Sequence, residues 1–102
     1  MDMRMMMKQA QKMQAQMAKA QEELKSFRYE ASAGGGMVKA VATGEGVIES
    51  VTINPEVLDP EDVDLLQDMV LAAVNDALKG VADESAARMG AVTGNMRIPG
   101  LM

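Results

Sequence analysis

The N-terminal part of the chain repeats apolar side chains at alternating spacings of three and four residues. This stripe comprises Met3, Met6, Ala10, Met13, Met17, Ala20, Leu24 and Phe27. Such spacing is typical of a helix whose narrow apolar seam packs against another helix. Gln, Ala, Lys and Glu occupy most positions between, and no Gly or Pro occurs before Gly34, so helix propensity agrees with the pattern. The stripe predicts one long helix over residues 3–28.

After this helix the apolar period shortens to two, which is typical of β-strands. Segments 37–42 and 47–53 alternate Val, Ile or Ala with other side chains, and segment 28–33 does so more weakly. Glycines at 34–36 and within 43–46 suit tight turns. The first glycine run precedes a strand and has no Gly-Lys-Ser/Thr after it, so it does not indicate a phosphate-binding loop. We expect three short antiparallel strands in a meander.

A second helix is predicted from about Asp59 to Met89. Asp59 suits the N-cap and Pro60 the first helical position. The apolar stripe of this helix is broad, as expected where a helix is buried on more than one side. Its members are Val63, Leu66, Val70, Ala73, Ala77 and Val81, with Leu65 and Met69 beside them. Gly80 is a candidate kink.

These elements give the order α-β-β-β-α, an α+β fold with a small antiparallel three-stranded sheet and two long helices. The first helix would be roughly 39 Å long, so part of it must project beyond the strands. We expect its seam to turn inwards, in an antiparallel arm, against a facing stripe of the second helix. That stripe comprises Leu78, Ala82, Ala86 and Met89. One domain then spans residues 1–89, and the tail 90–102 is predicted to be flexible.

Composition limits both the core and the chemistry. Phe27 and Tyr29 are the only aromatic residues, so the core must be thin, and a homodimer is the expected route to sufficient burial. The chain has no His and no Cys, which removes the usual general base and the usual zinc ligands. We find no catalytic constellation. The interpretation is a non-enzymatic protein without metal, cofactor or small-molecule substrate.

The apolar runs are too short for a membrane protein. None approaches the ~20 residues that span a bilayer, and Lys8 and Lys12 interrupt the N-terminal stripe where a signal peptide would be continuous. We therefore expect a cytoplasmic protein without a membrane partner. An alternative places residues 1–28 on a membrane surface, but the seam is rich in Ala and lacks Trp,.

The net charge of −5 hides an uneven distribution. Residues 1–21 carry four basic side chains against Asp2 alone, whereas residues 55–84 carry nine acidic side chains against Lys79 alone. The basic residues of the first helix all lie away from the apolar seam. They are Arg4, Lys8, Lys12, Lys19 and Lys25. They form either an ordinary solvated face or a stripe that contacts phosphates; since no aromatic residue lies among them, duplex DNA fits better than a single strand.

Three segments together resemble a known family. They are "GGGMVKA" at 34–40, "INPEVLDPEDVDLLQDMVLAAVNDAL" at 53–78 and "TGNMRIPGL" at 93–101. Over nearly the whole chain the sequence closely resembles the YbaB/EbfC family of bacterial nucleoid-associated proteins. The most specific part is Asp59-Pro60 followed by "AAVNDA" at 72–77.

The resemblance implies a tweezer-like homodimer that binds and organises chromosomal DNA in the nucleoid, with effects on gene expression or DNA repair. It associates the projecting helices at both ends of the chain with DNA contact. Carried over to this sequence, the DNA-binding residues are Arg4, Lys8, Lys12, Lys19, Arg88 and Arg97. The alternative is a non-enzymatic adaptor that docks on replication or recombination proteins through the acidic face 61–68 of the second helix.

Overall fold

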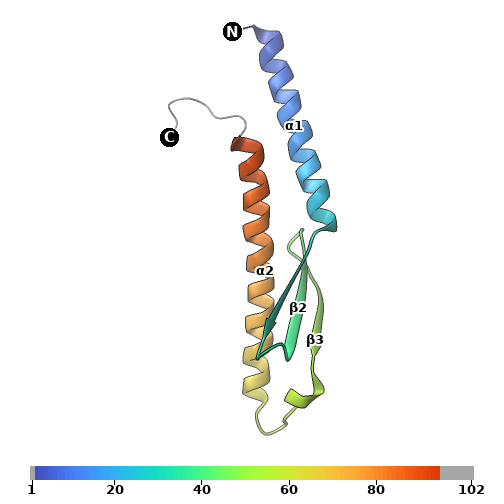
Figure 1. Ribbon diagram of the computed structural model, residues 1–102, viewed down its shortest axis with the longest axis vertical. Coiled ribbons are helices and arrows are strands. Elements are labelled where there is room, and N and C mark those ends of the chain that lie inside the picture. Colours follow the sequence, from blue (N-terminus) through green and yellow to red (C-terminus); the bar gives the residue numbers. More distant parts are fainter. Residues whose placement is uncertain (1, 95–102) are drawn as a thin grey trace.

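The computed structural model describes residues 2–94. In sequence order, a long helix is followed by the three strands of one sheet and then by a second long helix (Figure 1). The elements are α1 (Met3–Ser26), β1 (Arg28–Ala33), β2 (Val38–Thr43), β3 (Ile48–Ile53), the short 3₁₀ helix η1 (Pro55–Val57) and α2 (Val63–Gly94). This order confirms the predicted α-β-β-β-α fold. The molecule is elongated, with extents of 70 × 27 × 15 Å.

The three strands form one antiparallel sheet in the order β1-β2-β3. β1, whose sequence pattern was the weakest, pairs with β2 along its whole length. The turn between them holds Gly34, Gly35 and Gly36 at φ values of 63°, 68° and 91°, a region that side chains with a Cβ rarely adopt. The predicted turn is confirmed, and the sequence uses glycine there because the backbone requires it.

The core lies where α2 crosses the sheet. Its buried side chains are Val38, Ala40 and Ala42 from β2 and Met69, Ala73, Ala77 and Val81 from α2. The largest fully buried side chain is Val38. Alanines on both layers let the helix approach the sheet closely, which gives the thin core that the composition predicted. In the predicted stripe of α2, by contrast, Val63 is 47% exposed.

Gly80 lies where α2 packs against β1. A Cβ at this position would overlap the ring of Tyr29. The glycine therefore serves the close approach of the helix to an aromatic side chain.

The predicted start of α2 is wrong. Instead of capping a helix, Asp59 closes a turn: its carboxylate accepts a hydrogen bond from the Glu61 N–H (3.0 Å) and its carbonyl from the Asp62 N–H (3.0 Å). The helix begins at Val63. Asp62 precedes it, and its carboxylate accepts a hydrogen bond from the Leu65 N–H in the first turn, at 3.4 Å. An Asp side chain can satisfy the backbone of a turn as well as that of a helix, so the local sequence suits both.

α2 also ends later than predicted, at Gly94 rather than near Met89. Residues 90–94 therefore belong to a helix, although the sequence assigned them to the tail. The rest of the predicted tail, residues 95–102, lies outside the described residues.

The C-terminal end of α1 is docked on the turn between β2 and β3. The Gly44 N–H donates to the Phe27 carbonyl at 2.9 Å, and a Cβ on Gly44 would overlap the backbone of Leu24. Ala20 and Leu24 are buried, at 7% and 6% exposure. These contacts fix the root of α1, which we define as residues 20–27.

The predicted inward seam of α1 is wrong beyond this root. Towards its N-terminus, α1 extends past the described end of α2 (Figure 1). Met3 and Met6 are 75% and 52% exposed, and within the seam of α1 only Ala20 and Leu24 are buried. Of the facing stripe on α2, Ala82 and Ala86 are exposed.

The reason is the length of α2. Arg88 of α2 lies beside Glu23 of α1, with 3.2 Å between their charged atoms. The six residues of α2 that follow Arg88 extend about 9 Å, whereas the twenty residues of α1 that precede Glu23 extend about 30 Å,. The described part of α2 is therefore too short to cover the N-terminal half of α1.

Candidate nucleic-acid interface

The basic side chains of the described chain fall into two groups. One group is held in ion pairs. These are Lys25–Glu22 (3.2 Å), Arg28–Glu49 (2.7 Å), Lys79–Asp83 (3.0 Å) and Arg88 with Glu23 (3.2 Å) and Glu84 (2.9 Å). The second group forms no ion pair within residues 2–94. It comprises Arg4, Lys8, Lys12 and Lys19 on α1, with Lys39 on β2.

We define the basic stripe as Arg4, Lys8, Lys12 and Lys19, all of which are exposed. Because successive residues of an α-helix are rotated by about 100°, the four side chains leave α1 within an arc of about 80°. They extend over about 22 Å of the helix. The structure therefore brings four of the six predicted DNA-binding residues together on one face.

The opposite side of α1 is apolar. We define the methionine stripe as Met3, Met6, Met13 and Met17. By the same helical rotation its centre lies about 170° from that of the basic stripe. Charge and apolar surface thus point in nearly opposite directions on a helix that projects from the sheet.

The spacing of these charges depends on α1 being helical, and the sequence of α1 favours a helix even where few tertiary contacts support it. Asp2 is the N-cap, and its carboxylate accepts a hydrogen bond from the Arg4 N–H at 3.0 Å. A negative N-cap complements the helix dipole, and Gln, Ala and Met favour the helix. Asp2 is also the only acid before Glu22. The basic stripe is therefore displayed on a helix that its own sequence stabilises.

The two basic side chains of the described part of α2, Lys79 and Arg88, are held in ion pairs. The hydrogen bond from Lys79 to Asp83 raises the pKa of Lys79. Arg88 donates to Glu84 and Glu23, and its guanidinium lies 5.1 Å from the centre of the Phe27 ring.

Two predicted site residues are therefore not placed with the basic stripe. The side chain of Arg88 is 26% exposed and contacts the root of α1. The i−4 spacing to Glu84 was visible in the sequence and indicates a helical ion pair, but the partner Glu23 is 65 residues away. Arg97 lies outside the described residues.

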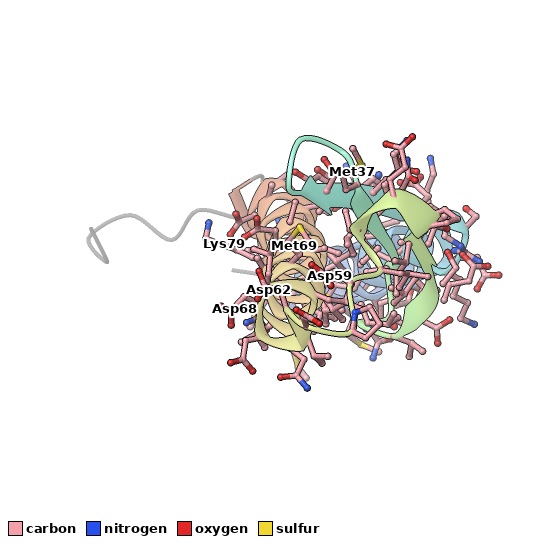
Figure 2. The ribbon with its side chains drawn as sticks, turned by 90° about the horizontal axis from the view of Figure 1, so that it is seen from below. Met37, Asp59, Asp62, Asp68, Met69 and Lys79 are labelled. Atoms are coloured by element: carbon pink, nitrogen blue, oxygen red, sulfur yellow. The ribbon has the colours of Figure 1, made fainter. Side chains whose placement is uncertain are left out.

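A run of acidic residues lies at the other end of the molecule. Residues 55–68 contain six acids and no Lys or Arg. Seen along the long axis, Asp62 and Asp68 lie on the side of α2 that faces away from the sheet (Figure 2). The basic stripe lies toward the opposite end (Figure 1). In the part of the chain that is described, no cluster of three or more acidic side chains could hold a metal ion.

Large apolar side chains remain exposed on α2 and β3. A shallow apolar groove on α2 is lined by Val63, Leu66, Gln67, Val70, Leu71 and Val74. Since α2 packs mainly on β1 and β2, the helix-facing side of β3 is poorly covered, and Val51 is 42% exposed. Contiguous apolar surface of this kind is typical of an interaction site. Neither helix, over the residues described, has the length and hydropathy needed to span a membrane.

Comparisons with known proteins identify the family of the chain and agree with its fold. The sequence model of the YbaB/EbfC DNA-binding family matches residues 1–96. A nucleoid-associated protein of Pelotomaculum thermopropionicum is 57% identical over 100 residues, covering 98% of this chain and 95% of the relative. Another, from Thermoanaerobacter pseudethanolicus, is 53% identical over 96 residues, covering 94% and 86%. A crystal structure of an uncharacterized protein from Helicobacter pylori matches with a TM-score of 0.74 at 25% identity, covering 94% of this chain and 97% of that chain.

Proposed function

Because the chain belongs to the YbaB/EbfC DNA-binding family, we propose that it binds duplex DNA as a homodimer, through the outer face of α1, and organises the bacterial chromosome. The family is not a known enzyme family. Relatives named as nucleoid-associated proteins support a place in the nucleoid, within the cytoplasm. The observation that carries the proposal is the basic stripe, four cations on one exposed face of a projecting helix that form no ion pair among residues 2–94.

The chemistry of the basic stripe suits phosphates. Lys8 and Lys12 each follow the preceding basic residue by four positions, a rise of about 6 Å, so neighbouring side chains can reach different phosphates of one backbone. Lys and Arg supply charge-assisted hydrogen bonds to such oxygens. α1 has no aromatic side chain between Met3 and Ser26, and base stacking on single strands needs aromatic faces. A duplex is therefore the better partner.

The apolar surfaces support the homodimer. The α2 groove, the uncovered side of β3 and the methionine stripe would all face water in a single chain. A second copy presents the same surfaces, and a two-fold pairing can bury them against one another. Such a dimer carries two basic stripes. Its net charge of −10, twice the −5 of one chain, repels DNA at long range, so binding depends on the local field of the stripes.

A titration of fluorescent duplex with the protein tests this function. We expect binding that weakens steeply as salt rises from about 50 to 200 mM, and weaker binding to a single strand of the same length. Light scattering should give twice the chain mass of 10.9 kDa. A compact monomer would exclude the dimer, and the absence of duplex binding even at low salt would exclude the DNA function. The adaptor that docks through residues 61–68 would then be the remaining candidate.

A further inference from the structure

We propose that Arg88 is a positioning residue that clamps the root of α1 to α2 and sets the direction in which the basic stripe meets DNA. This role differs from the phosphate contact that the sequence suggested for Arg88. It rests on the proposed function for its consequence, but the clamp itself is a property of the chain that can be measured without DNA.

The clamp is built from three contacts of one guanidinium. Arg88 Nη1 donates to Glu23 Oε2 at 3.2 Å, and Arg88 Nε donates to Glu84 Oε1 at 2.9 Å. The guanidinium also lies 5.1 Å from the centre of the Phe27 ring. Glu84 is on the same helix and orients the guanidinium, whereas Glu23 and Phe27 belong to the root of α1 and its C-cap. Within residues 2–94 no other ion pair joins α1 to α2.

Because the clamp lies at the root of α1, a small rotation there moves the basic stripe by a large distance. Lys19 and Arg4 lie four and nineteen residues before Glu23, which places the stripe about 6 to 28 Å along α1 from the clamp. A rotation of about 10° at the root would move the far end of the stripe by about 5 Å over this length. That is most of the spacing between neighbouring basic residues, so the angle of α1 decides how many phosphates the stripe can reach together.

Several polar contacts of the root join it to the sheet. Arg28 Nη1 donates to the carbonyls of Lys25 (2.8 Å) and Phe27 (2.9 Å), and Arg28 Nε donates to Glu49 on β3 (2.7 Å). The Gly44 N–H donates to the Phe27 carbonyl, and Ala20 and Leu24 add apolar contacts that are not directional. These contacts hold the last turn of α1 at the sheet. A guanidinium held in a planar fork is directional, so Arg88 adds a directional contact that holds α1 at its angle to α2.

Glu23→Gln distinguishes the clamp from a purely electrostatic effect of Glu23, because the two predict opposite changes in the affinity for DNA. The substitution removes a negative charge from the helix that carries the basic stripe. By charge alone, binding to DNA should become tighter. If Glu23 instead holds the clamp, binding should become about two- to fivefold weaker, the loss typical of one solvent-accessible ion pair. The salt slope should flatten by about 0.9 for each phosphate that the displaced basic stripe no longer reaches.

Glu22→Gln is the matched control. It removes the same charge one residue away, and the only ion-pair partner of Glu22 in the described chain is Lys25 on the same helix, at 3.2 Å. We expect this variant to bind duplex as tightly as the wild type or slightly more tightly. Arg88→Lys, which keeps the charge but not the planar fork, should weaken binding in the same way as Glu23→Gln.

A distance measurement makes the clamp testable without DNA. The chain has no cysteine, so spin labels at Gln9→Cys and Ser50→Cys report the distance between α1 and the sheet. Labelled chains are diluted with unlabelled protein, so that distances within one chain dominate. We expect the distribution to broaden with Glu23→Gln and Arg88→Lys and to stay narrow with Glu22→Gln. Circular dichroism should show that all three variants are folded.

The outcomes separate the clamp from the DNA function. If Glu23→Gln bound duplex as tightly as Glu22→Gln and kept the wild-type distance distribution, the clamp would be refuted. If Arg88→Gln lowered the salt slope by about 0.9 for each phosphate that it no longer neutralises while Glu23→Gln left binding unweakened, Arg88 would bind phosphate directly. If the wild type did not bind duplex, the proposed function would fail, and the distance distributions alone would decide for or against the clamp.

Discussion

Replacing Gly44 with alanine is expected to displace α1 from the sheet. A Cβ at this position would overlap three backbone atoms of Leu24, its carbonyl oxygen and carbon and its Cα. A side chain could rotate away from such a clash, but the backbone of a helix end cannot. Gly44 is absent from the glycines with positive φ, so the requirement at this position is space and not backbone conformation.

The size of the effect can be bounded from the contacts at the root. If α1 stays docked, overpacking costs about 1–3 kcal/mol, with the upper half expected because the obstacle is backbone. If α1 detaches, the chain loses the burial of Leu24, about 2 kcal/mol, and of Ala20, about 0.8 kcal/mol. It also loses the hydrogen bond from Gly44 to Phe27, about 1 kcal/mol. The free energy of unfolding should therefore fall by about 2 to 4 kcal/mol.

Thermal unfolding followed by circular dichroism measures this loss. For a domain of this size 1 kcal/mol corresponds to about 4–8 °C in Tm, so Gly44→Ala should lower Tm by at least about 8 °C. All variants are compared at one protein concentration, because the proposed dimerisation would make Tm depend on concentration. Gly90→Ala is the control: a Cβ there meets nothing within 4 Å, and alanine in a helix is more stable than glycine by about 0.5–1 kcal/mol. If Gly44→Ala melted within about 2 °C of the wild type, the docking of α1 on this turn would be refuted.

Three further predictions concern the dimer interface, the two faces of α1 and the contact of α2 with β1. Val70→Asp should split or unfold the dimer, since it puts an unpaired charge into the α2 groove; a stable dimer by light scattering would contradict that interface. Met13→Asp should destabilise the dimer through the methionine stripe, whereas Lys12→Ala should change stability by less than about half a kcal/mol; equal losses in Tm would refute the assignment of the two faces. Gly80→Ala should lower stability by about 1–3 kcal/mol because its Cβ meets the Tyr29 ring, and combined with Tyr29→Ala it should cost less than the sum of the single changes; strict additivity would contradict the contact.

The sequence predicted the elements because their patterns are local. Spacings of three and four residues identified α1, and glycines placed both turns. The contacting stripe of α2 was predicted in part: Ala73, Ala77 and Val81 are buried, but Val63 is exposed. Periodicity gives the apolar side of a helix without saying how much of that side this chain can cover. The sheet has three strands and α2 lies mainly over two of them, which only the structure reveals.

The predictions fail where a local sequence suits two backbone structures, or where a contact joins residues far apart in the sequence. Asp59 can cap a helix or close a turn, and the turn forms. The seam of α1 was expected to face α2, but a heptad pattern does not identify the partner helix. The assignment of Arg88 to DNA was carried over from the family resemblance and stays a prediction. What the sequence did not indicate is its bond to Glu23, which spans 65 residues and follows no spacing rule.

The central claim is that the basic stripe binds DNA phosphates, and a pair of triple variants tests it. The test variant changes Lys8, Lys12 and Lys19 to Gln, which keeps helix propensity while removing charge. The control variant changes Lys25, Lys39 and Lys79 to Gln. Both lower the net charge by the same amount, so any difference between them reports position and not total charge. Both should remain folded and dimeric.

The decisive measurement is the slope of log K against log[salt] for duplex binding by the wild type and both variants. Each phosphate contact contributes about −0.9 to the slope. Two basic stripes allow at most about eight contacts, and with about half of them made the wild-type slope should be about −3.5. The test variant retains only Arg4 on each stripe, so its slope should be no steeper than about −2 and most of its affinity should disappear, while the control variant keeps the wild-type slope. Full-strength binding with an unchanged slope by the test variant would contradict the account.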